Sequence, residues 1–564
     1  MAFLIALFLP LLSHADWLAI CPSETNHSDL KQEYFNADGS RFWLSLSKEK
    51  PTACKSIVLP LRAGDLQWME LISAQLEKNL GDRVSLQGFM EKGKLKISEI
   101  TPQHEKISNP QLLPHLVFRN LVPLFKFRSF GVEGRVSISR DDMGLRVNCQ
   151  KGNKPAGVLL HVSNKKLPLF PSLDVELSYK SSGGFEVGIS DQQRFDRGDP
   201  ILLTSLLAKK EFSGRKLSVP VKRLKKESQL HWSLVCPKNE ASIVLQSFSL
   251  QPTNKNNSLI KRSMWFWNPK DWVNKPEQIL HRAKSNNAQV LFISVILDES
   301  KQKIVNQHSL EKFISLASLK QLSVWVVEGD PHVVLPLARS RFAKRAKIFQ
   351  AYNDSHAKNE QLAGIQYDIE PYLIKGYSLA PETWAKAYVE TIQQLSESVS
   401  LPLEVVIPFW WQFQTINNKA MLDYLAPYVQ SINVMNYRTN VAMLHHFAQP
   451  ILNWGQQNNI DVNIALEVGP ISDETHWRYQ KSDVGELWRL NIAEQAVLLL
   501  LKKAQVNSQG VAYQFQFNRI VPGDLATFKS QQDRFERLLP SLEKQWQHWS
   551  SFKGISIHGL DKLD

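Results

Sequence analysis

The second half of the chain alternates between two hydrophobic patterns, and this alternation constrains its fold more than any other feature. Short apolar runs typical of strands are separated by longer stretches with helical periodicity. Strands that alternate with helices form parallel sheets, because each helix carries the chain back to start the next strand in the same direction. Strands are expected at 264–267, 290–296, 322–327, 364–370, 403–408, 431–437, 462–468 and 554–558. Eight units over about 300 residues are typical of a (β/α)8 TIM barrel, which we assign to residues 259–564.

Helices are expected between these strands, for example over 381–399, 492–504 and 535–549. The segment 510–517 also has a strand pattern, which makes one strand too many for the barrel. We interpret it as an insertion, because the run at 554–558 follows a helix directly and therefore supplies the eighth strand.

The first half of the chain has the patterns of two β-rich units. Residues 16–105 contain short strand patterns with one helical interval at 65–80, and the strand–turn–strand over 83–100 resembles a small OB-like barrel. Residues 125–252 contain period-two strands at short intervals, which predict a β-sandwich. Its strand order resembles a carbohydrate-binding jelly roll, and a scaffold without a ligand is an equal alternative.

The N-terminus indicates export. Residues 2–12 are apolar and are followed by Ser13-His14-Ala15, a pattern that signal peptidase cuts, so residues 1–15 are expected to be a signal peptide. No later stretch has the length and apolarity of a transmembrane span. We therefore expect a periplasmic or secreted protein.

Cysteine usage fits an oxidising compartment. The chain has four cysteines, Cys21, Cys54, Cys149 and Cys236, and the barrel has none. An even number in an exported chain predicts two disulfides, and pairing Cys21 with Cys54 and Cys149 with Cys236 keeps each bond within one unit. Four buried free thiols are the alternative. None of them has metal-ligand spacing, so no metal is expected.

The net charge of +13 suits an anionic partner such as an acidic polysaccharide. Positive residues are spread along the chain, and the densest group at 222–226 is short, so we expect no nucleic-acid partner. No GxxxxGK phosphate loop occurs, and no cofactor is expected. Sixteen tryptophans suit either protein cores or sugar-stacking surfaces.

The fourth expected barrel strand carries the candidate chemistry. It reads Gly-Ile-Gln-Tyr-Asp-Ile-Glu over 364–370, so Gln366, Asp368 and Glu370 share one face of the strand. The apolar face packs under helices, which directs the polar face into the barrel. Two adjacent carboxyls in a buried site raise each other's pKa, so one remains protonated near neutral pH and serves as an acid. Salt bridges to neighbouring strands are the structural alternative.

This strand resembles the DGxDxDxE signature of the chitinase-like glycoside hydrolases of family eighteen. By that resemblance Glu370 is the general acid and Asp368 orients the N-acetyl group of the substrate, while Gln366 stands in place of an Asp. The sequence Asn-Val-Met-Asn-Tyr-Arg at 433–438 is similar to the family's Met-x-Tyr-Asp. It implies that Tyr437 positions the acetamido group, and Arg438 replaces an Asp.

Further residues at the expected strand ends are candidates for substrate binding. Aromatic and hydrogen-bonding candidates are Trp265, Trp267, Trp410, Asn436 and His558. Trp411 adjoins Trp410, and at most one of the two is expected to face the groove. Glu467 and Glu328 are candidates for a second carboxylate if the substrate lacks an N-acetyl group, or for buried partners of Arg438.

These features predict an exported glycoside hydrolase that cleaves an amino-sugar-containing or acidic polysaccharide. The loss of two family Asp positions keeps two alternatives open. One is a catalytically inactive, lectin-like binding protein, and the other is a scaffold component of an envelope polysaccharide or secretion system.

Overall fold

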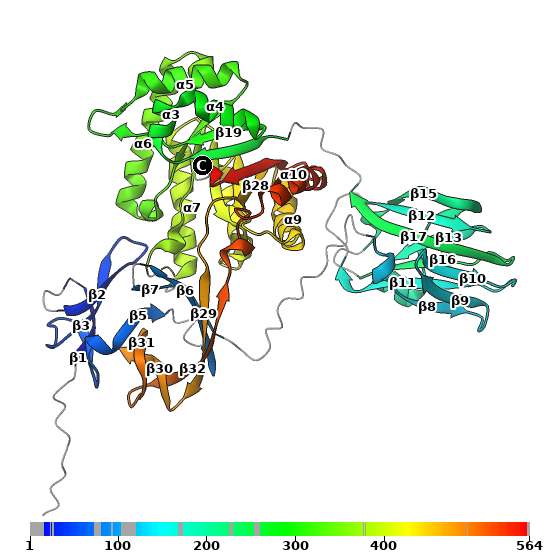
Figure 1. The fold of residues 1–564 in the computed structure, drawn as a ribbon, viewed down its shortest axis with the longest axis horizontal. Coiled ribbons are helices and arrows are strands. Elements are labelled where there is room, and N and C mark those ends of the chain that lie inside the picture. Colours follow the sequence, from blue (N-terminus) through cyan, green and yellow to red (C-terminus); the bar gives the residue numbers. More distant parts are fainter. Residues whose placement is uncertain are drawn as a thin grey trace, which may run out of the picture.

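The computed structural model describes residues 16–22, 24, 28–72, 80–91, 94–102, 120–166, 173–224, 229–252, 260–375, 377, 380–492 and 495–560. The expected signal peptide at 1–15 lies outside the described residues. Figure 1 shows a helix-covered barrel, two sheets beside it and a separate sandwich. Within the described ranges no helix is both long and apolar enough to cross a membrane.

Eight parallel strands close into a barrel in the second half of the chain. In order around the barrel they are β18 (Arg262–Phe266), β19 (Ala288–Ile293), β22 (Ser323–Glu328), β23 (Ile365–Tyr367), β24 (Leu403–Pro408), β27 (Ser431–Met435), β28 (Asp461–Glu467) and β33 (Phe552–His558). All eight overlap the strands that the sequence predicts, and β33 pairs with β18 to complete the ring.

Helices lie in the connections between barrel strands. They are α3 (Pro269–Asn274), α4 (Pro276–Ser285), α5 (Gln307–Leu319), α6 (Pro336–Ser355), α7 (Pro381–Ser398), α8 (Met421–Leu425), α9 (Val441–Asn458) and α10 (Gln532–Trp546). In α5 the buried residues are Leu310, Phe313, Ile314 and Ala317, spaced as one face of a helix requires. Two short hairpins, β20 (Leu297–Asp298) with β21 (Lys303–Ile304) and β25 (Thr415–Ile416) with β26 (Lys419–Ala420), extend the loops after β19 and β24.

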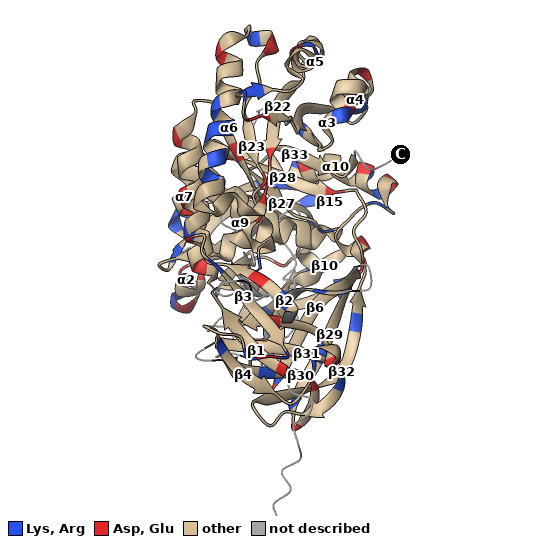
Figure 2. Cartoon of the chain, turned by 90° about the vertical axis from the view of Figure 1, so that its left-hand side faces the viewer, with Lys and Arg blue, Asp and Glu red and all other residues tan. Residues whose placement is uncertain are grey.

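A seven-stranded antiparallel sheet joins the two ends of the chain. Its order is β5 (Leu66–Ile72), β31 (Gln495–Val506), β30 (Val484–Ile492), β32 (Val511–Val521), β29 (Glu474–Ser482), β6 (Arg83–Glu91) and β7 (Lys94–Pro102). Strands β29 to β32 lie between β28 and α10 in the sequence, so the segment at 510–517 is outside the barrel, as predicted. In Figure 2 this sheet lies below the barrel.

Two segments expected to be helical contain strands in the structure. Residues 66–72 of the helix predicted over 65–80 form β5, while 73–79 lie outside the described residues, and the helix predicted over 492–504 is replaced by β31. The two strands pair with each other, with Leu499 opposite Met69. Both predictions were wrong because long-range pairing overrides local helix propensity.

A four-stranded sheet covers part of the outer face of the seven-stranded one. Its order is β2 (Ser28–Phe35), β3 (Arg41–Ser47), β1 (Asp16–Cys21) and β4 (Lys55–Leu59). Leu44 and Leu46 pack with Leu71, Trp488 and Leu499 in one core. The segment predicted as an OB-like unit therefore shares its core with residues inserted into the barrel half.

Residues 120–252 form a sandwich of two five-stranded sheets. The first has the order β15 (Lys209–Val219), β12 (Leu173–Ser181), β17 (Ala241–Pro252), β10 (Gly144–Cys149) and β9 (Val136–Asp141). The second has the order β14 (Ile201–Leu206), β13 (Phe185–Ser190), β16 (Gln229–Val235), β11 (Ala156–Lys166) and β8 (Lys126–Gly131), with α2 (Gln192–Arg197) after β13. Leu145, Val147, Val158 and Leu160 contribute to the core between the sheets.

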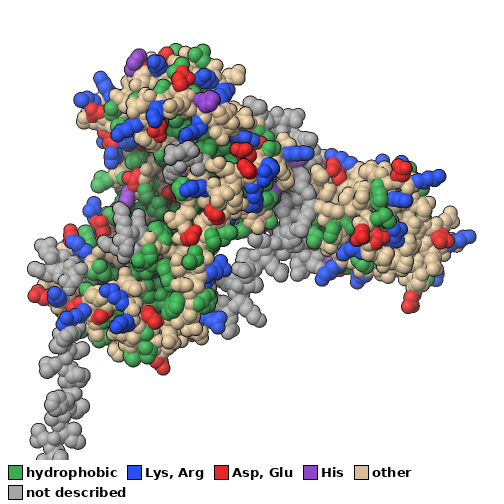
Figure 3. Space-filling model, in the orientation of Figure 1, with side chains coloured by type: hydrophobic (Ala, Val, Ile, Leu, Met, Phe, Trp, Pro, Cys, Tyr) green, Lys and Arg blue, Asp and Glu red, His purple; other side chains and the backbone are tan. Residues whose placement is uncertain are grey.

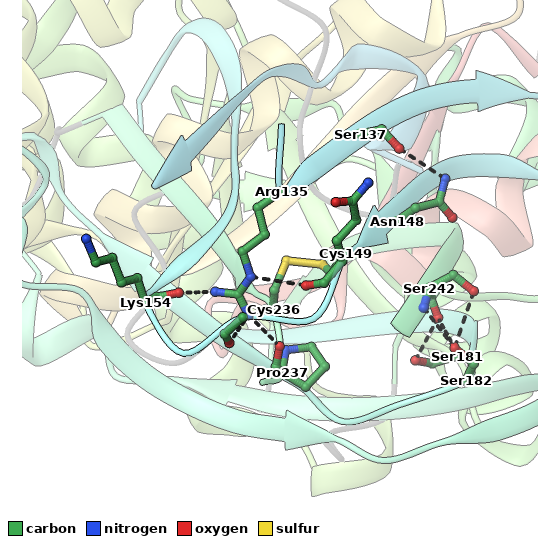
Figure 4. The surroundings of a disulfide bond; sticks show 12 residues. Arg135, Ser137, Asn148, Cys149, Lys154, Ser181, Ser182, Cys236, Pro237 and Ser242 are labelled. Atoms are coloured by element: carbon green, nitrogen blue, oxygen red, sulfur yellow. Dashed lines mark hydrogen bonds between the residues drawn. A yellow bond between two sulfur atoms is a disulfide. The ribbon is translucent and has the colours of Figure 1, made fainter. Parts of the chain in front are cut away.

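Both predicted disulfides, Cys21–Cys54 and Cys149–Cys236, are present. Beside the second bond, Arg135 donates to the backbone oxygens of Gln150, Gly152 and Pro237 at 3.1, 2.6 and 2.8 Å (Figure 4). The bond and the guanidinium together fix two loops at one end of the sandwich. Disulfides fit an oxidising compartment.

Candidate active site

Asp368 and Glu370 lie where β23 leaves the barrel wall. The backbone N–H of Asp368 donates to the oxygen of Glu328 at 2.8 Å, so the strand pairing continues one residue beyond Tyr367. Gln366, two residues before Asp368, is fully buried. Asp368 and Glu370 are partly exposed. Of the three residues predicted to share a face, Gln366 is therefore buried inside the barrel, and Asp368 and Glu370 lie at the carboxyl end of the strand.

The two carboxyls hold protons more tightly than ordinary acids. Burial and then the neighbouring Glu370 charge raise the pKa of Asp368 to about 7. Burial also raises the pKa of Glu370, while a hydrogen bond from Tyr372 and the proximity of His558 oppose the rise. Because they interact, the proton held near neutral pH belongs to the pair.

One carboxyl oxygen of Asp368 accepts no hydrogen bond from the described part of the chain. Its Oδ1 atom is buried and has no hydrogen-bond partner there. A buried polar atom without a partner costs about 1–3 kcal/mol, and in native structures such an atom is exceptional. The arrangement suits a donor brought by a substrate.

Glu370 is held by a tyrosine that the sequence analysis did not single out. The Tyr372 hydroxyl donates to Glu370 Oε1, and its ring packs edge-on against Trp410, with centroids 5.2 Å apart. Trp410 is partly exposed and Trp411 is buried, as expected for adjacent residues. A Tyr two residues after the acid in the Glu-Pro-Tyr turn was the available signal.

Tyr437 and His558 lie near the carboxyl pair. Their rings are stacked with centroids 6.0 Å apart and an interplanar angle of 21°. Trp267 Nε1 donates to His558 Nε2 at 3.1 Å, and because an indole N–H only donates, the ring proton lies on Nδ1. His558 Nδ1 thus donates to Glu467 Oε2 at 2.6 Å. Glu467 Oε1 accepts from the Gly469 backbone at 2.6 Å, so this carboxylate orients the histidine.

A buried polar network lies inside the barrel below these residues. Trp265 Nε1 donates to Gln366 Oε1 at 2.6 Å, and Gln366 Nε2 donates to Glu404 Oε1 at 2.5 Å. Glu404 also accepts from Ser431, Asn433 and Asn463 at 2.7, 3.1 and 2.8 Å. Burial raises the pKa of Glu404 despite these donors. The network explains why Gln366 and Trp265 are buried below the site.

Sequence analysis did not single out Glu404. The available signal was a single carboxylate within the apolar run Leu-Glu-Val-Val-Ile-Pro of β24. Since side chains alternate along a strand, Glu404 had to point either into the barrel or against helices, and both places are dry.

Three predicted site residues have other contacts. Glu328 accepts from Arg345 of α6 through both oxygens, each at 2.6 Å. Asn436 is buried and donates to the backbone oxygen of Leu444 at 2.9 Å, away from the carboxyl pair. The prediction that Glu328 or Glu467 pairs with Arg438 is wrong, because Arg345 and His558 are their partners. The Arg438 guanidinium instead lies over Phe409, 4.7 Å from the ring centroid.

Comparison with known proteins gives no family for the chain. No protein-family model and no curated protein matches it. Among solved structures, a mutant family 29 carbohydrate-binding module complexed with mannohexaose is 12% identical, with a TM-score of 0.18, covering 22% of this chain and 79% of that one. A mutant of this module with cellulohexaose is 13% identical, with a TM-score of 0.19 and coverages of 24% and 87%. Likenesses at these scores do not bear on the function of the chain.

Proposed function

We propose that the protein is an exported glycoside hydrolase that cleaves an amino-sugar-containing or acidic polysaccharide. The observation that carries the proposal is the Asp368–Glu370 pair, which retains a proton near neutral pH at the carboxyl end of a barrel strand. We further propose that residues 259–564 are a (β/α)8 barrel of the chitinase-like class, in which active sites lie at these strand ends. The two disulfides support export, and a signal peptide at 1–15 belongs to the same proposal.

In the proposed reaction Glu370 is the general acid. It transfers its proton to the glycosidic oxygen as the bond from that oxygen to the anomeric carbon breaks. The acetamido oxygen of the substrate attacks the anomeric carbon, and Asp368 Oδ1 accepts the acetamido N–H. Water then attacks the anomeric carbon, which breaks its bond to the acetamido oxygen. Glu370 takes a proton from this water and is restored. Tyr437, which is stacked on His558 and lies near the pair, positions the acetamido group.

A substrate without an N-acetyl group needs a protein carboxylate instead. Glu467 is the nearer candidate, because it interacts electrostatically with Tyr437 and bonds to His558. Glu328 is the weaker candidate, because it is neutralised by an ion pair with the guanidinium of Arg345 in α6. The remaining residues proposed to contact the saccharide are Trp267, Trp410, His558 and Arg438.

A lectin-like protein without activity is the second candidate. The observation that favours it is Gln366, which stands where the resembling family has an acid and is bonded on both sides, to Trp265 and Glu404. A binder nevertheless has little use for two carboxyls with raised pKa values side by side. The sandwich at 125–252 is proposed to add carbohydrate binding in either case.

The test is hydrolysis of a panel of oligosaccharides and bacterial polysaccharides by wild type and Glu370→Gln. The matched control is Glu390→Gln, which changes a solvent-exposed glutamate of α7. We expect wild type and the control to cleave the same substrate and Glu370→Gln to lose at least about 100-fold in rate, the range for a general acid. Binding without turnover in all three proteins indicates the lectin-like alternative.

A further inference from the structure

Resting on the proposed function, we propose that Arg438 binds an anionic group of the saccharide, a ring carboxylate or a sulfate ester. The site then selects an acidic polysaccharide over a neutral one.

Most of the hydrogen-bonding capacity of Arg438 is unused. Its Nη1 donates to the backbone oxygen of Tyr437 at 2.6 Å. The Nε and Nη2 atoms donate to no group in the described part of the chain, and neither atom is sealed from solvent. No carboxylate of the described residues lies within 4.0 Å of the guanidinium. An arginine has five N–H donors, so an edge of this group is available to a ligand.

Aromatic rings hold the guanidinium in one orientation. Its central carbon lies 4.7 Å from the ring centroid of Phe409 and 5.7 Å from that of Phe447. The two rings are themselves in contact, with centroids 4.1 Å apart. Both rings lie on one side of the guanidinium, and these contacts use none of its N–H donors, so Nε and Nη2 remain free for two parallel hydrogen bonds to one oxyanion.

Arg438 adjoins residues that lie near the carboxyl pair. It follows Tyr437, whose ring lies within electrostatic range of both Asp368 and Glu370. It also rests on Phe409, which immediately precedes Trp410, and Trp410 packs on the tyrosine that donates to Glu370. Arg438 follows β27 and contacts Phe409, which follows β24, so it lies at the same end of the barrel as Glu370, where a bound polysaccharide passes neighbouring strand ends.

The charge of Arg438 is costly where it stands. The side chain is only partly exposed, and burial lowers its pKa. Partial burial of a cation without an anionic partner is unfavourable, and a bound oxyanion offsets the cost. None of the described surface carboxylates pairs with Arg438, so the protein itself does not offset the cost of this charge.

The test measures binding to Glu370→Gln protein, so that no ligand is consumed. The probes are a hexasaccharide of alternating N-acetylglucosamine and glucuronic acid and its carboxyl-reduced form. A sulfated oligosaccharide and its desulfated form make a second pair. We expect one acidic probe to bind at least about tenfold more tightly than its neutral form, because charge-assisted hydrogen bonds are stronger than neutral ones. The pair that shows the preference identifies the anionic group.

Three variants made in that protein separate recognition from structure. Arg438→Gln is expected to abolish the preference, and Arg438→Lys to retain part of it through charge alone. Arg537→Gln, which removes an exposed arginine of α10, is expected to change nothing. Melting temperatures establish that each variant is folded. Equal binding of acidic and neutral probes, or a preference that survives Arg438→Gln, overturns the proposal.

The outcomes also separate this proposal from the proposed hydrolysis. An Arg438-dependent preference without any turnover by wild type supports anion recognition and rejects the hydrolase. Turnover of neutral oligosaccharides that Arg438→Gln leaves unchanged supports the hydrolase and rejects anion recognition.

Discussion

Asp368 combines two properties that folding alone does not favour. Its Oδ1 atom is buried without a partner among the described residues, and its pKa is raised to about 7. The buried hydroxyl of Tyr388, whose pKa is raised by burial and by the Asp368 charge, also lacks a partner there. Groups left in this state cost stability, and they cluster where a ligand completes their hydrogen bonds.

The cost of Asp368 predicts a dependence of stability on pH. A carboxyl with a raised pKa in the folded state binds its proton more tightly than the unfolded chain does. Its contribution to stability is complete below about pH 4 and is lost as pH rises through about 7. Asp368→Asn is therefore expected to raise the free energy of unfolding by about 4 kcal/mol at pH 8, and not at pH 4.

Urea denaturation of both proteins at the two pH values measures this difference. Asp483→Asn, a change in an exposed turn, is the control and is expected to have no pH-dependent effect. An Asp368→Asn effect of equal size at pH 4 and pH 8 contradicts the raised pKa.

The acidic residues of the site were predictable because strand alternation is strict. Once 364–370 was recognised as a barrel strand, Gln366, Asp368 and Glu370 had to share a face. Tyr372 and Glu404 were not identified, because their roles depend on where a turn and a neighbouring strand bring them. Tyr372 contacts Glu370 only because of the conformation of the turn after β23. Glu404 contacts Gln366 only because of the register between β23 and β24, and neither can be read from the sequence.

At the scale of elements, β31 shows why an apolar run is ambiguous. Residues 496–501 are buried without interruption, with Val497, Leu499 and Leu501 facing one core and Ala496, Leu498 and Leu500 facing another. A strand buried on both faces has no polar alternation, and its leucines and alanine also favour helix. The barrel strands were predicted correctly because helices with polar faces separate them.

The same burial predicts a large effect for one substitution in β31. Leu499 is fully buried opposite Met69, so Leu499→Ala is expected to lower the free energy of unfolding by about 2–5 kcal/mol. Leu337 of α6 is 89% exposed, and Leu337→Ala is expected to change the free energy of unfolding by less than about 0.5 kcal/mol. Chemical denaturation compares the two. Similar small effects indicate that residues 495–506 are not an interior strand.

At the scale of the whole molecule, the N-terminal sheets adjoin the mouth of the barrel. Lys375, in the loop after β23, donates to Gln32 of β2 at 2.9 Å. Phe35 packs edge-on against His332 in the loop after β22, with centroids 5.6 Å apart. Strands β29 and β32 belong to the connection from β28 to α10, which also leaves the barrel at the carboxyl end of a strand. Figure 3 shows charged side chains of both signs scattered over the visible face.

This arrangement predicts how the chain tolerates deletion. Residues 260–564 alone keep β29 and β31 but lose their neighbours β6 and β5, which leaves buried leucines and two strand edges open. We expect this fragment to aggregate. A chain that lacks only 120–252 retains every strand of the barrel and of the seven-stranded sheet, and we expect it to remain soluble.

Soluble yield and cooperative thermal unfolding of the two proteins test this expectation. A soluble 260–564 fragment that unfolds cooperatively contradicts the shared core. Aggregation of the chain without 120–252 shows that the sandwich also stabilises the rest of the molecule.

In the proposed reaction the Asp368–Glu370 pair supplies the proton for glycoside cleavage. The most direct test is the pH dependence of kcat/KM between pH 4 and 9, on the saccharide that wild type cleaves, for wild type and Asp368→Asn. We expect the wild-type rate to fall as pH rises through about 7, because the pair then loses its last proton. In Asp368→Asn this fall is expected at lower pH, since Glu370 then titrates without the second carboxyl. A wild-type rate that stays constant through pH 7 to 9, or a fall at the same pH in both proteins, contradicts the claim.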